Sequence, residues 1–182
     1  MLITISGAQG VGKSTLIKEL IKRGWYSPPS IARELKKRGH GINRDGNDNT
    51  QIRVLEEHIN RAKKYLNSNE DVVLDRSIID GMVYTKYLYD HQRVSLSTLH
   101  KFENATNIYI NYYDKIFYIP PEFDIIPDGY RDGDREFRNK IVDIFDYYID
   151  KYNIDVIKLR GSVEDRLNSL YDNIEKTDIR GI

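Results

Sequence analysis

A glycine-rich segment near the N-terminus contains the residue types that phosphate binding requires. Residues 7–14 read Gly-Ala-Gln-Gly-Val-Gly-Lys-Ser and match the pattern G-x-x-x-x-G-K-[ST] at every defined position. Glycines allow backbone N–H groups to turn toward phosphate oxygens, the lysine reaches the β- and γ-phosphates, and the Ser hydroxyl ligates Mg²⁺. The pattern predicts an ATP site that uses Mg²⁺ and is formed by Gly7, Gln9, Gly10, Val11, Gly12, Lys13, Ser14 and Thr15.

A charged pair, Asp75-Arg76, follows the apolar run that begins at residue 71. In open α/β sheets, ligands bind beyond the carboxyl ends of the strands, so this pair and the glycine-rich loop should face one crevice. Asp75 can hold Mg²⁺ through water or accept a proton from an attacking hydroxyl, and Arg76 can bind a phosphate in bidentate fashion. The alternative is a structural ion pair that closes the strand.

A charged, glycine-containing segment over about residues 123–138 has the composition of a lid. Phosphoryl transfer places negative charge on the γ-phosphate oxygens, and an arginine that closes over them neutralises it. Closure also excludes water from the reaction. We expect Arg131 and Arg135 to serve in this way, with Arg138 a weaker candidate; a solvated surface loop is the alternative.

The elements that must position these residues alternate between strand and helix. Short apolar runs predict strands, and longer segments with apolar residues at the helical period predict helices between them. Such alternation is typical of a three-layer α/β fold, a parallel sheet with helices on both faces, in one domain over residues 1–182. We expect five strands, at residues 2–6, 25–27, 71–75, 115–119 and 155–159.

Composition excludes several classes of function. The 182 residues contain 28 Lys+Arg and 28 Asp+Glu, and this balance argues against a dedicated duplex-DNA binder. There is no cysteine, so disulfides, thiolate metal sites and cysteine nucleophiles are excluded. We see no apolar run that would span a membrane and no signal peptide, so we expect a cytoplasmic protein. The oligomeric state stays open, a homodimer included.

The glycine-rich loop together with Asp75-Arg76-Ser77 resembles the thymidylate kinase and deoxynucleoside kinase group. The charged segment after the run at 115–119 also resembles the nicotinamide riboside kinase domain of a bacterial NAD-biosynthesis regulator, and a family of small AAA-type P-loop proteins with many phage members. The resemblance covers nearly the whole chain, through Gly7–Thr15, Ala32-Arg33-Glu34-Leu35, Asp75-Arg76-Ser77, Asp80-Gly81, Tyr118–Pro121 and Asp128–Arg138.

The resemblance implies roles for further residues. It places acceptor phosphate on the Asp-Arg pair, here Asp75-Arg76, and adenine beside the turn Gly161-Ser162. The latter turn also reads as a simple glycine turn with a serine helix cap. Tyr84, shortly after the pair, is a candidate for the acceptor site, although ordinary helix packing is an alternative.

One departure from the family pattern bears on the acceptor. A Glu commonly stands three positions before the arginine of the Ala-Arg-Glu-Leu segment, and here that position is Ser30. A nucleoside kinase needs a base for a free hydroxyl, whereas a nucleotide kinase needs cations for an anionic phosphate. Arg33 and Arg76 can supply such cations.

These observations favour a (deoxy)nucleoside monophosphate kinase. A nucleoside-type kinase (deoxynucleoside or nicotinamide riboside) with Asp75 as the base remains an alternative, as does a nucleic-acid kinase. A nucleotide-gated switch, in which no acceptor accelerates ATP turnover, is the alternative outside enzymes.

Overall fold

Four parallel strands form one sheet in the computed structural model, which describes residues 1–122 and 135–178. The order is β2-β1-β3-β4, with β1 in the middle, so that Ile3 of β1 lies opposite Val73 of β2 and Lys115 of β3. The carboxyl ends of these strands therefore meet at one edge of the sheet. The strands are β1 (Leu2–Ser6), β2 (Val72–Asp75), β3 (Lys115–Tyr118) and β4 (Ile157–Lys158).

The expectation of five strands is wrong for the described residues. Within the expected strand at 25–27, only Tyr26 pairs, through an isolated parallel bridge to Val72. Its N–H donates to the Asp71 carbonyl and its carbonyl accepts from the Val73 N–H, each at 2.9 Å. Pro28 and Pro29 follow, and because proline has no N–H the ladder cannot continue.

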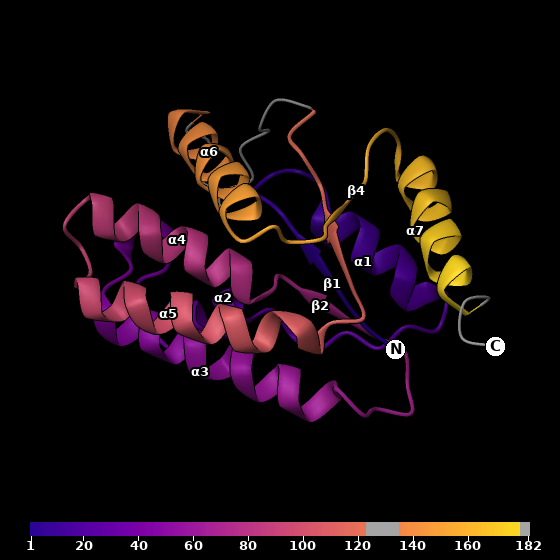
Figure 1. The fold of residues 1–182 in the computed structure, drawn as a ribbon, viewed down its shortest axis with the longest axis horizontal. Coiled ribbons are helices and arrows are strands. Elements are labelled where there is room, and N and C mark those ends of the chain that lie inside the picture. The colour runs from indigo at the N-terminus through magenta and orange to yellow at the C-terminus, as the bar shows by residue number, and fades with distance from the viewer. Residues whose placement is uncertain (123–134, 179–182) are drawn as a thin grey trace.

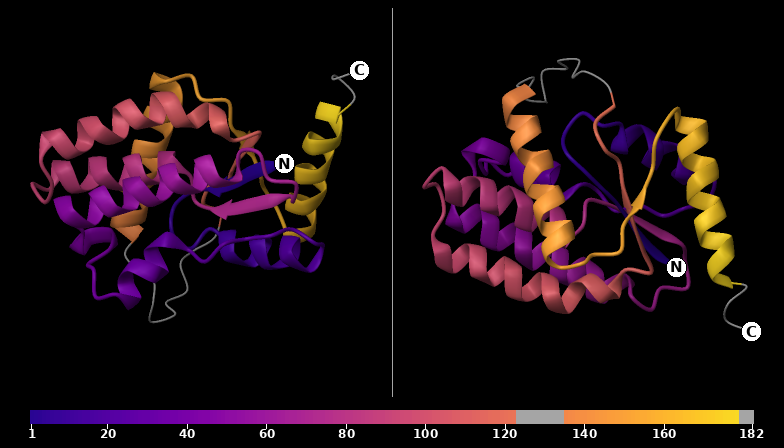
Figure 2. Two further views of the ribbon diagram at one scale, coloured as in Figure 1. Left: turned by 90° about the horizontal axis from the view of Figure 1, so that it is seen from below. Right: turned by 45° about the horizontal axis from the view of Figure 1, so that its top comes forward.

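Helices cover both faces of the sheet. Figure 1 shows α1 and α7 on one side and α3, α4, α5 and α6 on the other, and the second panel of Figure 2 separates α6 from α7 across the strands. No helix of the described chain is long and apolar enough to cross a membrane. The helices are α1 (Lys13–Lys22), α2 (Ile31–Lys37), α3 (Asp48–Tyr65), α4 (Ile78–Asp90), α5 (Leu96–Tyr109), α6 (Arg135–Lys151) and α7 (Val163–Asp178), with 3₁₀ turns η1 (Asn43–Asp45) and η2 (Ile110–Tyr112).

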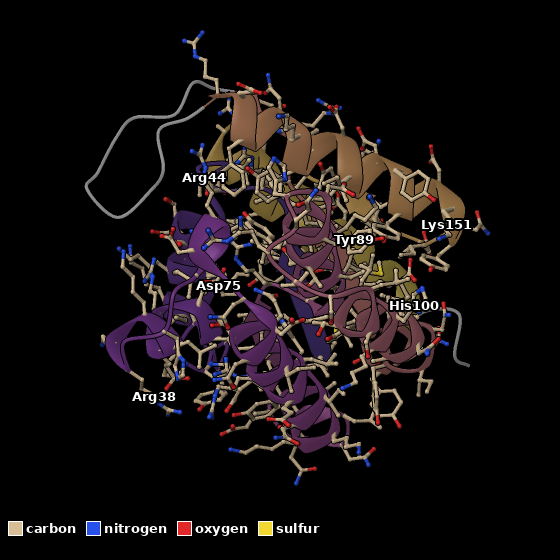
Figure 3. All side chains as sticks on the ribbon, turned by 90° about the vertical axis from the view of Figure 1, so that its left-hand side faces the viewer. Arg38, Arg44, Asp75, Tyr89, His100 and Lys151 are labelled. Atoms are coloured by element: carbon tan, nitrogen blue, oxygen red, sulfur yellow. The ribbon has the colours of Figure 1, made fainter. Side chains whose placement is uncertain are left out.

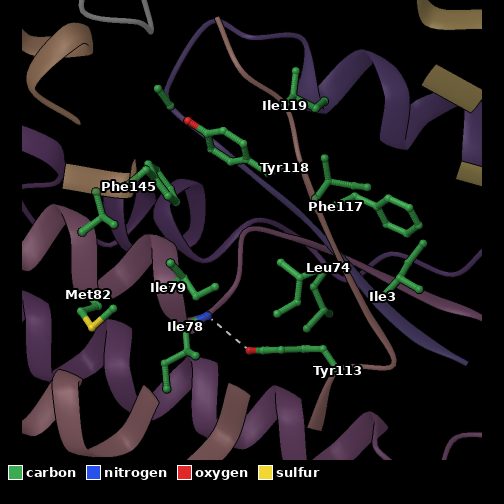
Figure 4. Close-up of a cluster of buried hydrophobic side chains, with 14 of the residues drawn as sticks. Ile3, Leu74, Ile78, Ile79, Met82, Tyr113, Phe117, Tyr118, Ile119 and Phe145 are labelled. Atoms are coloured by element: carbon green, nitrogen blue, oxygen red, sulfur yellow. Dashed lines mark hydrogen bonds between the residues drawn. The ribbon is translucent and has the colours of Figure 1, made fainter. Parts of the chain in front are cut away.

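The main core lies between the sheet and helix α4. This helix is buried on nearly every side, as expected of a helix enclosed by α3, α5, α6 and the strands. Figure 4 shows Leu74 and Tyr118 from the strands on the same side as Ile79 and Met82 of α4, whereas Phe117 points to the other side, toward Ile3. The Tyr113 side chain satisfies a backbone donor at the start of this helix, because its hydroxyl accepts a hydrogen bond from the Ile78 N–H at 3.3 Å. The core thus fixes the first turn of α4 directly behind Asp75-Arg76.

Candidate active site

The loop between β1 and α1 has the backbone that a phosphate cradle needs. Gly7 and Gly12 have φ angles of 136° and 96°, in the region that side chains disfavour. Neither position has room for a side chain, because a Cβ on Gly7 would lie 2.7 Å from the Ile119 carbonyl oxygen and one on Gly12 2.8 Å from Arg166. The glycines of the motif are therefore required by conformation and by close approach. Gln9 and Val11, also predicted for this site, are buried within the loop, whereas Thr15 is exposed on α1.

Lys13 and Ser14 begin helix α1 and face the same loop. The buried Lys13 ammonium donates to the carbonyl oxygens of Gly7 and Ala8 at 2.6 and 2.5 Å. The Ser14 hydroxyl accepts a hydrogen bond from the Arg33 guanidinium at 3.2 Å. The structure thus brings Arg33, predicted for the acceptor side, to the residue predicted to ligate the metal.

Arg166 of α7 braces the loop from behind, and sequence reasoning missed it. Its side chain is 4% exposed, and its guanidinium donates to the Val11 carbonyl and to the Glu122 carboxylate, each at 2.9 Å. The hydrogen bond from Arg166 holds the pKa of Glu122 below its ordinary value. No local pattern identifies such an arginine, since its partners lie 155 and 44 residues away.

Asp80 connects the loop to the Asp75-Arg76 region. Its buried carboxylate accepts from the Gly7 N–H at 3.2 Å and from the Ser77 N–H at 2.9 Å. The Ser77 hydroxyl lies 2.8 Å from that of Ser6, and it also caps α4 in a capping box with Asp80. The resemblance included Asp80-Gly81 without giving either residue a role. The structural role of Asp80 is to fix the relative position of the two predicted sites.

Arg76 is held in place by several neighbours. Its φ of 81° is unusual for a residue with a side chain, and such strain is commonly found at functional sites. The guanidinium lies 4.6 Å from the ring centroid of Tyr84 and 3.8 Å from the Asp80 carboxylate. Burial alone would lower the pKa of Arg76, but Tyr84, Asp80 and Asp75 together raise it. Arg76 therefore carries a fixed positive charge.

Two pockets meet at Asp75 and Arg76. The loop pocket, on the phosphate-loop side, is lined by Gln9, Gly10, Gly12, Lys13, Ser14, Ser30, Ala32, Arg33, Lys36, Lys37, Ile42, Asn43, Asp75 and Arg76. The helix pocket, between α2, α3 and α4, is lined by Ile31, Ala32, Ile42, Asn43, Thr50, Gln51, Val54, His58, Asp75, Arg76, Asp80, Gly81 and Tyr84. In Figure 3, Asp75 lies between the labelled Arg44 and Arg38, well away from His100. The pockets share the lining residues Ala32, Ile42, Asn43, Asp75 and Arg76, so they adjoin and together form the crevice at the carboxyl edge of the sheet.

The remaining predicted residues lie elsewhere. Gly161 and Ser162 form the turn before α7, where the Ser162 hydroxyl accepts from the Asp165 N–H at 3.2 Å. The helix-cap alternative is therefore confirmed, and the adenine role stays a prediction. Arg131 and most of the lid at 123–138 fall outside the described residues. Arg135 is exposed at the start of α6, and Arg138 is buried in the same helix.

The oxygen donors of the crevice fit a magnesium ion bound through a nucleotide. Among the described residues no cluster of three or more His, Cys, Asp or Glu could hold a metal by itself. Mg²⁺ in nucleotide sites takes few protein ligands and completes its shell with phosphate oxygens and water. The Ser14 hydroxyl and the Asp75 carboxylate, both on the loop pocket, suit this arrangement.

Comparison with solved structures identifies the fold. The NadR protein in complex with NAD and AMP-PNP superposes with a TM-score of 0.71 at 17% identity, over 93% of this chain and 48% of NadR. The deoxyadenosine kinase from M. mycoides with bound dATP gives 0.70 at 18% identity, over 96% and 100% of the two chains. The thymidylate kinase from Candida albicans gives 0.65 at 17% identity, over 97% and 92%. All three share the P-loop kinase fold with this chain, which spans less than half the length of NadR.

Comparison of the sequence with protein families gives a direct match. No curated protein is significantly similar to the chain. A family model described as an AAA domain, however, matches residues 2–166. That match includes the phosphate loop, Asp75-Arg76, Asp80 and Arg166, which are the residues that build the crevice. The chain therefore belongs to this AAA domain family and has the fold of the P-loop kinases.

Proposed function

We propose that this protein is an ATP-dependent phosphotransferase that acts on a (deoxy)nucleoside monophosphate. The observation that carries the proposal is that the loop pocket and the helix pocket adjoin at Asp75 and Arg76, which line both of them. A phosphate donor in the first pocket and an acceptor in the second would meet at these two residues. Transfer between bound partners needs such a junction, because catalysis of phosphoryl transfer is mostly positioning and charge neutralisation.

The charges of the crevice favour an acceptor that is already phosphorylated. Beside Lys13, the loop pocket is lined by Arg33, Lys36, Lys37 and Arg76, against the single carboxylate of Asp75. A free hydroxyl would not need four further cations, whereas an acceptor phosphate adjoining ATP brings additional negative charge to the same place. This agrees with Ser30 at the position where related proteins have a Glu.

In this mechanism the residues have separate roles. Lys13 and the loop amides hold the phosphates of ATP, with Mg²⁺ on Ser14 and Asp75 neutralising charge on them. Arg76, with Arg33, binds the acceptor phosphate, whose oxygen attacks the γ-phosphorus as the bond to ADP breaks. Arg131, from the expected lid, would neutralise the transferring group. No proton has to be removed from the acceptor, because its phosphate is already an anion.

A nucleoside kinase is the second candidate, because Asp75 lines both pockets and is partly buried at their junction. A carboxylate there is placed to accept a proton from an acceptor hydroxyl. The two candidates differ in what Asp75→Asn should do. With a hydroxyl acceptor the variant loses its base, and turnover should fall by roughly 10²–10⁴-fold. With a phosphate acceptor only a metal contact changes, and the loss should be smaller.

The direct test is an acceptor panel. The protein is incubated with ATP and Mg²⁺ and with nucleosides, nucleoside monophosphates or short oligonucleotides, and ADP and phosphorylated products are measured. Conversion of a monophosphate to its diphosphate supports the proposal. Turnover of nucleosides alone would replace it with the second candidate, and ADP formation that no acceptor accelerates would leave the nucleotide-gated switch.

A further inference from the structure

His58 lies at the inner end of the helix pocket with its hydrogen-bonding capacity unused. The side chain, from the middle of α3, is 3% exposed and lines the pocket. Its ring approaches α4 where Gly81 has no side chain, since a Cβ there would lie 3.2 Å from His58 Cδ2. Neither ring nitrogen hydrogen-bonds to a described residue. Buried polar groups in native proteins normally have a partner, so a ligand is the natural partner for a group that lines a pocket.

A second polar side chain, Tyr84 of α4, lines the helix pocket opposite α3 and is 6% exposed. Its hydroxyl makes no hydrogen bond of ordinary geometry to a described residue, although it interacts with the Arg76 guanidinium. The aromatic face of Tyr84 is covered by the Arg76 guanidinium, which leaves the hydroxyl as its polar end. By contrast, the nearby Gln51 amide is engaged, because its oxygen accepts from the Thr85 hydroxyl at 2.9 Å. The His58 imidazole and the Tyr84 hydroxyl therefore face one pocket from two helices.

The charge around His58 defines what these groups can recognise. Burial, together with the nearby Arg61 and Arg76, lowers the pKa of His58 to about 3, so the ring is neutral. A neutral imidazole offers one donor and one acceptor. The rest of the lining carries charges of both signs, because Asp75 and Asp80 line the same pocket and interact with the Arg76 guanidinium. The neutral imidazole is therefore suited to hydrogen-bond a polar, uncharged group of a ligand.

We propose that His58, with the Tyr84 hydroxyl, determines acceptor specificity by hydrogen-bonding to the edge of a nucleobase. The inference rests on the proposed function, since it places the acceptor phosphate at Arg76 and the base between α3 and α4. It narrows the acceptors to nucleotides whose base presents neutral donors and acceptors to the imidazole.

Variants of His58 test the hydrogen bond. His58→Phe keeps an aromatic ring without donors or acceptors, and His58→Gln keeps both. For the best acceptor, His58→Phe should lower kcat/KM about tenfold, mainly through KM, while the KM for ATP stays unchanged. His58→Gln should restore part of this loss. A packing role alone would change stability but would leave the ratios between acceptors at their wild-type values, and that result would overturn the proposal.

The matched control is Thr106→Val. Thr106 is also buried, and its hydroxyl also lacks a hydrogen bond among the described residues, but it lies in α5 at a different pocket. This variant should leave the ratios of kcat/KM between acceptors unchanged.

Equilibrium binding of nucleoside monophosphates separates the specificity role of His58 from the proposed function. If wild-type protein transfers to no acceptor but binds one in a His58-dependent manner, only the proposed function fails. Binding or turnover that ignores His58 refutes the present inference.

Discussion

The phosphate loop and the helix pocket differ in how their polar groups are satisfied. In the loop, Lys13 donates to two carbonyl groups of the loop itself, and Arg166 donates to a third, that of Val11. In the helix pocket, His58 has no hydrogen-bond partner among the described residues, and the Tyr84 hydroxyl makes no hydrogen bond of ordinary geometry to one. The loop is thus held in shape by the protein, whereas the helix pocket keeps hydrogen-bonding groups available for a ligand.

This difference separates affinity for phosphate from choice of acceptor. A loop built from backbone amides and one lysine recognises any phosphate chain of the right length. The helix pocket takes its walls from α2, α3 and α4, and its polar groups are side chains rather than backbone amides. Asp80 joins the regions through the amides of Gly7 and Ser77. Changes in the loop should therefore affect all acceptors alike, and changes in the helix pocket should affect acceptors selectively.

The largest expected effect is that of Lys13→Ala. Loss of the cation that holds the β- and γ-phosphates should lower kcat by roughly 10²–10³-fold or more with every acceptor, while the fold persists. Steady-state assays, with circular dichroism as a check of folding, measure this. Lys18→Ala, at an exposed position of the same helix, should behave as wild type. Retained turnover in Lys13→Ala would exclude the loop from the active site.

Arg166→Gln should come next, because it removes the brace behind the loop. Breaking a buried ion pair costs about 3–5 kcal/mol of unfolding free energy. We expect roughly 2–3 kcal/mol here, since the Glu122 side chain is 19% exposed and can be hydrated. The KM for ATP should rise as well. Arg160→Gln is the control, because Arg160 approaches the same carboxylate only at 3.7 Å and from solvent; equal losses in urea denaturation would contradict the bracing role.

Asp80→Asn should have a smaller effect on stability but should act on both regions. The variant keeps one carbonyl oxygen but presents an amide to the N–H groups of Gly7 and Ser77, at a cost of roughly 1–2 kcal/mol in unfolding free energy. Because the loop and the start of α4 lose their common anchor, KM should rise for ATP and for the acceptor together. Asp90→Asn, exposed at the end of the same helix, should change neither. A rise in only one KM would show that Asp80 does not couple the regions.

The parts that the sequence predicted correctly depend on local pattern. The run at 71–75 became β2 (Val72–Asp75), and the phosphate loop lies between strand and helix as its chemistry requires. The strand predicted at 155–159 is only the two residues Ile157–Lys158 in the structure. The strand predicted at 25–27 is a single bridge at Tyr26. In both cases the residues have β-forming types, but pairing at a sheet edge depends on neighbours that the local pattern does not specify.

The parts that sequence reasoning missed depend on distant contacts. The sequence analysis did not single out His58, and nothing in α3 reveals that Arg61 and Arg76 lie near it or that Gly81 makes room for it. Arg166 likewise appears as one more charge on an amphipathic helix. The structure places Arg33 on the loop pocket and Tyr84 on the helix pocket, whereas their roles toward an acceptor stay predictions, with helix packing the alternative for Tyr84.

The smallest expected effect is a dependence of stability on pH that comes from His58 in the helix pocket. Its pKa is about 3 in the folded protein and about 6.5 in the unfolded chain, because burial and two arginines disfavour the cation. Between these values only the unfolded chain binds the proton, so unfolding free energy should fall as the pH drops below 6.5, by at most about 1.4 kcal/mol per pH unit. His58→Gln removes this pH dependence of the unfolding free energy. His100→Gln, which changes an exposed histidine, retains it. Denaturation of the three proteins between pH 7.5 and 5 (roughly the His range) measures the difference. Parallel curves for wild type and His58→Gln would mean that His58 is solvated, and the unused hydrogen-bonding capacity of the helix pocket would then be filled by water.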